Sequence, residues 1–365
     1  MRPNFAIAVF VLAGLELCAA GLKARTTTAA ESAGLKARTT TATVSASPEV
    51  RCEMTSCVGR VLRTRLQGGS EKQDPPYVSV VFQPANAGVQ RDTDSHQAEN
   101  SRIGITVAAR AQQPGEVVVL TLTSPDAPHV VAFGRTVPVV PVGPQQFRAL
   151  IGIDLDATPG SHRVTITAGS GERHVETMYQ LVVKPHRFPT RRLEVDEAFV
   201  NPPPGARERI EREAQQLARL WEQSAPEALW TGRFIKPVPD RANSSFGTRS
   251  IFNGVPRSPH SGTDFLSPAG TPIKAPNAGR VMLAADLYFS GNTIVVDHGL
   301  GVVSLFAHLS TFAVHEGQLV ETGQMLGTVG ATGRVTGAHL HWALHVNGAR
   351  VDPLSLVAAL GETDR

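Results

Sequence analysis

Short apolar runs, separated by turns rich in glycine and proline, make up most of this 365-residue sequence. The 33 Gly and 26 Pro residues would interrupt long helices, whereas both residue types are common in turns between strands. A hydrophobic content of 41% is enough to build a sizeable core, which excludes disorder throughout. The sequence therefore predicts a mostly β protein, and its length fits two compact domains with linkers.

The strand pattern occupies two stretches of the chain on either side of a helical one. Over residues 48–185, short runs such as EVVVLTL (116–122) and HRVTITA (162–168) have the spacing of an antiparallel sandwich. We expect an immunoglobulin-like β-sandwich there, on strand spacing alone. Residues 186–243 predict a helical connector, because RERIEREAQQLARLW (207–221) carries apolar residues at a helical period. Residues 244–355 predict a Gly-rich antiparallel β domain, followed by a tail over 356–365.

The N-terminal residues have the layout of an export signal. Arg2 precedes an apolar run from Phe5 to Leu15, and small residues follow up to Ala20. This pattern predicts a signal peptide over 1–20 and an exported protein of the periplasm or cell envelope. Lipidation at Cys18, which would tether the chain to a membrane, is the alternative to cleavage.

A duplicated polar segment follows the predicted signal. GLKARTTTA at 21–29 recurs at 34–42 and has no apolar face, which predicts a flexible linker over 21–47. Beyond it, Cys52 and Cys57 could pair as a small disulfide loop in an oxidising compartment or remain free thiols.

The charge of the chain is almost balanced. Lys and Arg number 35 against 32 Asp and Glu, for a net charge of +3. A dedicated nucleic-acid-binding protein would need a clustered basic face, so that class is excluded. The sequence gives no indication of the oligomeric state.

Histidines and one aspartate in the C-terminal domain suggest metal chemistry. His260 and Asp264 are four residues apart, and His339 and His341 are two apart, so each pair shares one face of a strand. Two imidazoles and a carboxylate suit Zn²⁺ with a water at the fourth position. With His308, two histidines are then left for proton transfer and for stabilising an oxyanion.

The segment from Phe246 to Pro353 contains a series of short motifs: FGTR (246–249), HSGTDF (260–265), GTPIKAP (270–276), GRV (279–281), GNTIVVDHG (291–299), AHLS (307–310), VETGQMLGTVGATGRVTGAHLHW (320–342) and VDP (351–353). In these motifs the segment resembles the lysostaphin/LytM-type zinc metallopeptidases of family M23. The resemblance implies one zinc ion per chain, bound by His260, Asp264 and His341, with His308 and His339 as catalytic residues.

Two positions depart from the pattern of the family. Many similar enzymes carry a tyrosine two residues before the middle histidine, where this chain has Phe306. Some carry another tyrosine at the position of Gly254. Arg249 either supplies positive charge in its place or forms a structural ion pair.

The resemblance implies hydrolysis of peptide bonds in bacterial peptidoglycan. The order of β module, helical connector and FGTR-containing domain favours an endopeptidase that cuts stem-peptide cross-links over one that cuts glycine bridges. The alternative is a non-catalytic envelope factor that activates another cell-wall hydrolase, although such relatives lose zinc ligands that this chain retains.

Overall fold

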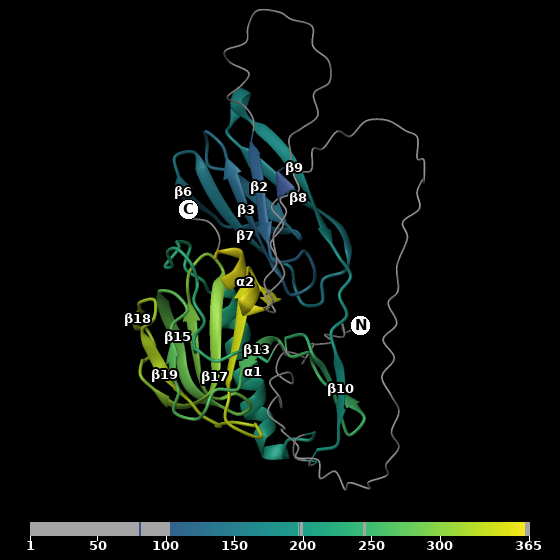
Figure 1. The fold of residues 1–365 in the computed structure, drawn as a ribbon, viewed down its shortest axis with the longest axis vertical. Coiled ribbons are helices and arrows are strands. Elements are labelled where there is room, and N and C mark those ends of the chain that lie inside the picture. The colour runs from purple at the N-terminus through teal and green to yellow at the C-terminus, as the bar shows by residue number, and fades with distance from the viewer. Residues whose placement is uncertain (1–79, 82–102, 196, 198–199, 244–245, 362–365) are drawn as a thin grey trace, which may run out of the picture. The chain divides into compact units, whose positions relative to one another are not determined.

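The computed structural model describes residues 80–81, 103–195, 197, 200–243 and 246–361. The described residues fall within one compact unit of the chain. They are mostly β, with antiparallel sheets and few helices, as predicted (Figure 1). The predicted signal peptide, the duplicated linker and the pair Cys52 and Cys57 lie outside the described residues, as do residues 362–365. The predicted tail (356–365) begins within a helix, since residues 356–359 belong to α2 (Pro353–Ala359).

Two antiparallel sheets form an N-terminal module over residues 103–183. Strand β1 adds to the edge of the first sheet, where it pairs with β2. The first sheet has the order β1-β2-β3-β7-β6 and the second the order β5-β4-β8-β9. One apolar core lies between them, with Leu120 and Ile151 from the first sheet and Val164 and Leu181 from the second. The strands are β1 (Val80–Val81), β2 (Gly104–Ala109), β3 (Val117–Thr123), β4 (His129–Ala132), β5 (Arg135–Val137), β6 (Val139–Gly143), β7 (Gln146–Gly152), β8 (Gly160–Ala168) and β9 (Val175–Val183), with a 3₁₀ turn at Gly171–Arg173.

Strands β5 and β6 were not predicted from the sequence. Pro138 lies between them and Pro141 lies within β6, and prolines argue against a strand. Because β6 pairs only with β7 at the edge of its sheet, the missing N–H group of Pro141 is tolerated there.

The predicted connector contains the expected helix and an additional strand. After a 3₁₀ turn at Pro204–Ala206, helix α1 covers Arg207–Glu222, close to the predicted 207–221. Strand β10 (Thr190–Leu193) pairs in parallel with β11 (Arg249–Phe252), which pairs in turn with β12 (Val255–Pro256). The connector is therefore hydrogen-bonded to the first strand of the predicted C-terminal domain.

A nine-stranded antiparallel sheet, called the large sheet below, forms the C-terminal part. Its main order is β13-β20-β17-β16-β15-β18; β19 pairs with β17 and β14, and β21 pairs with β20. Helix α2 (Pro353–Ala359) follows it. The strands are β13 (Gly262–Phe265), β14 (Pro272–Lys274), β15 (Gly279–Leu287), β16 (Gly291–Asp297), β17 (Val302–Phe312), β18 (Leu319–Val320), β19 (Met325–Val329), β20 (Leu340–Val346) and β21 (Ala349–Val351).

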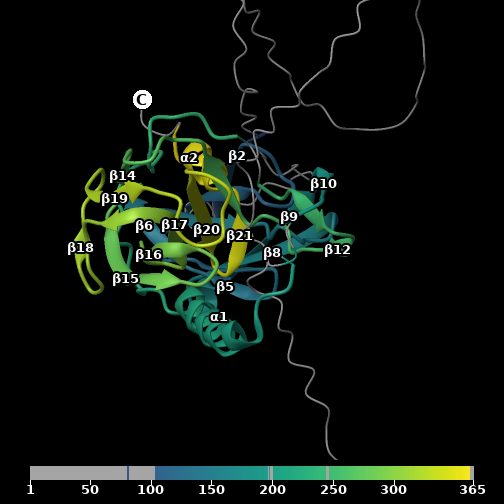
Figure 2. The same cartoon turned by 90° about the horizontal axis from the view of Figure 1, so that it is seen from below.

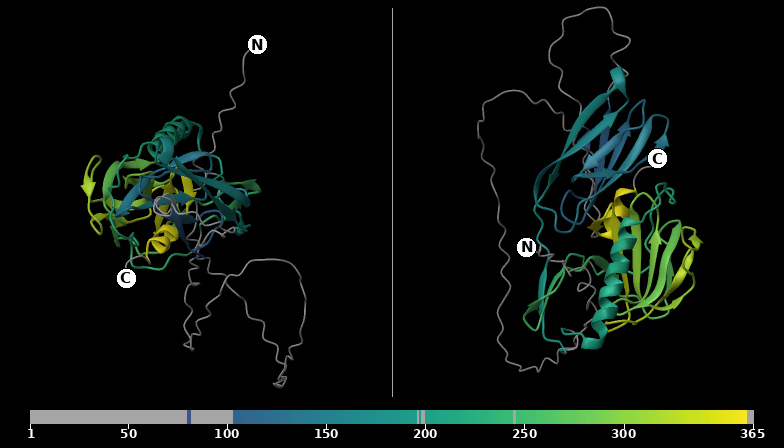
Figure 3. Two further views of the ribbon diagram at one scale, coloured as in Figure 1. Left: turned by 90° about the horizontal axis from the view of Figure 1, so that it is seen from above. Right: turned by 180° about the vertical axis from the view of Figure 1, so that it is seen from behind.

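The two faces of the large sheet have different coverings. Phe306 and Trp342 lie in the main apolar core on one side, called the core face. Their neighbours Leu305, Ala307 and Ala343 point to the opposite side, the site face, where Leu217 of α1 packs on them. Figure 2 shows α1 and α2 on opposite sides of β17 and β20, and Figure 3 shows α1 running alongside the strands.

Within the described part of the chain, neither helix has the length and apolar character needed to cross a membrane.

Candidate metal centre

Strands β13 and β20 bring Asp264 and His341 side by side. The two residues are direct partners in the antiparallel ladder. Because Phe265 and Trp342 next to them point into the core, the alternation along each strand turns Asp264 and His341 to the site face. His260 lies just before β13, where its backbone pairs with Gly247 and Thr248. The structure thus places all three predicted ligands together.

The three side chains meet through one atom each. His260 Nε2 lies 3.0 Å from His341 Nδ1 and 3.1 Å from Asp264 Oδ1. His341 Nδ1 lies 2.9 Å from the same carboxylate oxygen. All three side chains are buried.

This triangle fits a cation better than a set of hydrogen bonds. Two neutral imidazoles can each donate one proton to Asp264 Oδ1. His260 Nε2 and His341 Nδ1 are then close to each other without a hydrogen bond between them. A zinc ion accepts all three lone pairs, and bonds of about 2.0–2.1 Å at tetrahedral angles place ligand atoms roughly 3.3–3.4 Å apart. Among the described residues, Asp264 Oδ2 and His341 Nε2 are also buried without a hydrogen-bond partner.

Protonation favours the ligand forms of these residues. Burial alone would raise the pKa of Asp264, but the adjacent His260 and His341 hold it well below its ordinary value. Burial, partly offset by the hydrogen bond to Asp264, lowers the pKa of His341 to about 4. At neutral pH the centre therefore presents an ionised carboxylate and a neutral His341 ring.

A β-bulge in β17 directs His308 toward the centre. Asn292 pairs with Leu309 and Ile294 with Phe306, so Ala307 and His308 together face one residue of β16. His308 has a φ of 68°, a left-handed conformation that costs a non-glycine residue about 1–3 kcal/mol. Phe306 and Leu309, three residues apart, can both enter the core because His308 is turned out of the strand's alternation.

Backbone carbonyls orient the two remaining histidines. His308 Nδ1 lies 3.0 Å from the oxygen of Thr332, and His339 Nδ1 lies 3.0 Å from that of Gly337. Because a carbonyl only accepts, both Nδ1 atoms carry a proton, and in the neutral form of each ring the lone pair is therefore on Nε2. The two rings lie 4.8 Å apart between centroids, and His308 lies 6.2 Å from His341.

His308 is in its neutral form at neutral pH. Burial, followed by the neighbouring His339 and His341, lowers its pKa to about 3. The neutral ring, with its lone pair on Nε2, is the form that a general base needs before it takes up a proton.

Gly262 is required by the close approach of two strands. A Cβ atom at this position would lie 2.5 Å from the His341 ring and 2.7 Å from the Trp342 carbonyl oxygen. The glycine of the HSGTDF segment thus leaves room for the His341 ring beside β13. The sequence pattern marks this glycine, but the strand pairing explains it.

Other residues singled out in the sequence do not take part in the centre. Phe306 is buried in the core and stacks on Trp342. Arg249 pairs with Asp156 at 3.2 Å, which favours its structural role, and Gly254 lies in the β11–β12 turn. His345 stacks on Trp221 of α1 at 3.9 Å.

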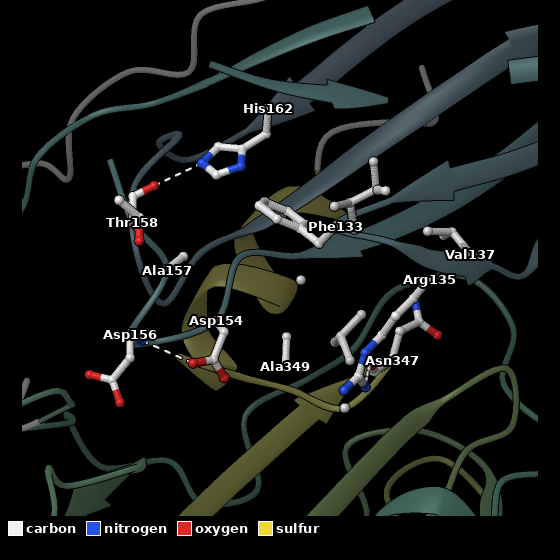
Figure 4. A pocket seen from close by; sticks show the side chains of 15 residues that line it. Phe133, Arg135, Val137, Asp154, Asp156, Ala157, Thr158, His162, Asn347 and Ala349 are labelled. Carbon is white, nitrogen blue, oxygen red and sulfur yellow. Dashed lines mark hydrogen bonds between the residues drawn. The ribbon is translucent and has the colours of Figure 1, made fainter. Parts of the chain in front are cut away.

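A cavity of about 420 Å³ lies elsewhere, between the N-terminal module and the β20–β21 hairpin (Figure 4). Phe133, Asp154, His162 and Asn347 are among its lining residues, and none of the five predicted site residues is. Its charged and polar groups are already paired: Asp154 binds Arg350, and His162 Nε2 bonds the Thr158 carbonyl. The candidate metal ligands are therefore outside this cavity.

Comparison with known proteins identifies two family matches along the chain. The model of peptidase family M23 matches residues 258–353, and that of the M23 N-terminal domain matches residues 111–177. The chain is 34% identical over 145 residues to the peptidoglycan DD-endopeptidase ShyA of Vibrio cholerae, covering 40% of this chain and 31% of the relative. It is 41% identical over 97 residues to the DD-carboxypeptidase/endopeptidase Mpg of Neisseria meningitidis, covering 27% and 22%.

The match thus spans about a third or less of the length of these curated relatives. A solved structure gives broader coverage. The crystal structure of a Pseudomonas aeruginosa protein assigned to peptidase family M23 is 36% identical with a TM-score of 0.55, covering 68% of this chain and 96% of that one.

Proposed function

Because the chain belongs to peptidase family M23, we propose that it is an exported zinc endopeptidase that hydrolyses peptide cross-links of bacterial peptidoglycan. The observation that carries this proposal is the buried triangle of His260, Asp264 and His341, with two oriented histidines beside it. A structural zinc site would close with a fourth protein ligand, whereas three ligands leave a position for water.

We assign the metal to His260 Nε2, Asp264 Oδ1 and His341 Nδ1, the three converging atoms. A zinc ion bound there would lower the pKa of a coordinated water to about 7, which supplies a nucleophile at neutral pH. The burial of the three side chains keeps their positions fixed and strengthens the electrostatic interactions within the centre.

His308 and His339 provide the proton transfers. Each ring holds its Nδ1 proton on a backbone carbonyl, so Nε2 of one ring would accept one proton from the water as its oxygen bonds to the peptide carbonyl carbon. The protonated ring would then give this proton to the leaving amine as the C–N bond breaks. An imidazolium N–H next to the developing oxyanion also stabilises its negative charge.

The substrate class follows from the relatives. Relatives named DD-endopeptidases and DD-carboxypeptidase/endopeptidases support a cross-link between stem peptides as the bond cut here. Such a substrate lies outside the cytoplasm, which agrees with the export signal predicted over residues 1–20. The proposed partner is therefore the peptidoglycan of the periplasm or cell envelope.

We also propose the division into an immunoglobulin-like module (48–185), a connector (186–243) and a peptidase domain (244–355). The two-sheet core of the module supports the first, and the two family matches fall within the first and third. This proposal includes the Greek-key connections between strands that define an immunoglobulin-like domain.

The test is mass spectrometry of cross-linked muropeptide dimers after incubation with the purified protein. We expect monomers to appear with zinc and to be absent after chelation, and the fragment masses to name the bond. Intact dimers after incubation with a folded, zinc-loaded protein would contradict the proposed endopeptidase activity. They would favour the alternative, a factor that activates another cell-wall hydrolase.

A further inference from the structure

Arg110 of the N-terminal module makes a charged contact with the end of the large sheet. It follows strand β2, and its Nη2 atom donates to Glu116 at 2.7 Å and to Asp352 Oδ2 at 2.6 Å. Glu116 belongs to the same module and is buried, so it fixes the guanidinium from one side. The planar fork of Arg110 then holds Asp352 from the other side.

Asp352 continues this chain of contacts to the strand that carries Asp264. Its Oδ1 atom accepts from Thr263 Oγ1 at 2.8 Å and from the Leu354 backbone N–H at 3.1 Å, at the start of α2. Thr263 is buried and immediately precedes Asp264. Because alternate residues point to opposite faces, Thr263 anchors β13 from the core face while Asp264 points to the site face.

Strand β13 needs such an anchor. It is four residues long and lies at the edge of the large sheet, paired along its length with β20. On its other side, the described residues provide a bond from the Asn243 N–H to the Asp264 carbonyl and a bridge between Ala242 and Phe265. Because β13 is short and has a full partner strand on one side, the bond from Thr263 to Asp352 adds a further constraint on the position of Asp264.

The module is itself held firmly against the large sheet. The Val117 N–H donates to Ser355 Oγ at 2.6 Å, and the Asp352 N–H donates to the Gly115 carbonyl at 2.7 Å. Val117 and Leu150 of the module share a buried apolar cluster with α2 and β20, which Figure 1 shows next to the module. Arg110 is therefore presented from a rigid surface.

We propose that Arg110 is a positioning residue for the metal centre, acting through Asp352 and Thr263 on strand β13. This inference rests on the proposed zinc site and adds a role for the N-terminal module, which would complete the catalytic unit. Residues that orient metal ligands from outside the coordination sphere commonly change metal affinity about 10–100-fold when they are removed. Since Arg110 acts through two further side chains, we expect an effect at the lower end of this range.

A second ion pair between the same two parts of the chain provides a matched control. Arg350 of β21 donates to Asp154 at 2.6 Å and to Asp156 at 3.0 Å, and both carboxylates belong to the module. The two carboxylates line the cavity in Figure 4. The hydrogen bonds of the Arg350 side chain go to these carboxylates and not to β13. Removing this pair weakens the interface without touching the anchor of Asp264.

The experiment compares Arg110→Met with Arg350→Met in the full chain, by chelator competition for zinc and by thermal unfolding. We expect both variants to unfold at a lower temperature. Zinc should bind about 10-fold more weakly to Arg110→Met and within about two-fold of wild type to Arg350→Met. Arg110→Lys, which keeps the charge but loses the fork, should recover part of the affinity.

Thr263→Val isolates the last contact, since it removes the hydroxyl while leaving the interface with the module intact. It should weaken zinc binding to a similar extent, and adding Arg110→Met should then cost little further affinity. If Arg110→Met does not fold, Thr263→Val alone decides the question.

Wild-type zinc affinity in Arg110→Met or Thr263→Val would overturn this inference, as would an equal loss in Arg350→Met. A wild-type protein that binds no zinc would instead overturn the proposed function, so the two failures are distinguishable.

Discussion

The N-terminal module and the large sheet are both antiparallel, but their ladders differ in regularity. In the module, β2–β3, β3–β7, β4–β8 and β8–β9 pair without interruption, and a register shift occurs at the edge pair β6–β7. In the large sheet, β14–β19, β15–β16, β16–β17 and β17–β19 each contain a register shift. In the β16–β17 ladder the shift lies between Phe306 and Leu309 and therefore includes His308. The ladder is thus interrupted where a side chain is turned toward the candidate metal centre.

The histidines of the two regions show the same contrast. His129 of the module is exposed and His162 contacts a nearby backbone carbonyl. In the large sheet, His260, His308, His339 and His341 are buried and lie next to one another. Burial and convergence, more than residue type, distinguish a candidate catalytic site from scattered histidines.

The largest expected effect is that of His341→Ala. Removing one of three ligands should abolish both zinc retention and muropeptide cleavage, because two ligands do not hold the ion. His129→Ala in the module is the control and should leave both unchanged. Full zinc content in His341→Ala, measured by elemental analysis, would show that His341 is not a ligand.

His308→Ala should separate catalysis from metal binding. Loss of the proton acceptor should lower kcat by about 10²–10⁴-fold, while most of the zinc is retained. Steady-state kinetics with parallel metal analysis tests this. An unchanged kcat would show that His308 takes no part in catalysis. Loss of zinc would show that His308 is a metal ligand.

A buried histidine of the large sheet should make stability depend on pH. Burial lowers the pKa of His298 to about 4, while the unfolded chain titrates near its ordinary 6.5. Between these values the unfolded state binds more protons, so stability should fall as the pH falls from about 6.5 to about 4, by up to roughly 3 kcal/mol.

Urea unfolding at several pH values measures this dependence. His298→Asn should lose part of it, whereas His315→Gln, at an exposed position, should keep it. The same slope in wild type and His298→Asn would assign the effect to other groups.

The smallest of these effects is expected for Gly262→Ala. The new methyl group would collide with the His341 ring, which should cost about 1–3 kcal/mol of stability and weaken zinc binding. Gly205→Ala is the control, because a Cβ there meets nothing within 4 Å. Equal zinc affinity in the two variants would show that the His341 ring can shift without harm.

Sequence reasoning brought out the five residues that the structure groups together, because strand periodicity and short motifs carry that information locally. Helix α1 was predicted for the same reason. Strands β5 and β6 were missed because prolines mask an edge strand, and β10 because its parallel partner lies far along the chain. The contact between Arg110 and Asp352 joins residues 242 positions apart and depends on packing that no local pattern encodes.

The most direct test of a zinc endopeptidase is a zinc titration of the metal-free protein, followed by the cleavage of cross-linked muropeptide dimers. We predict no cleavage without metal, then a linear rise that ends at one zinc per chain. Cleavage by the metal-free protein, or no cleavage after one zinc has bound, would contradict the proposed zinc endopeptidase.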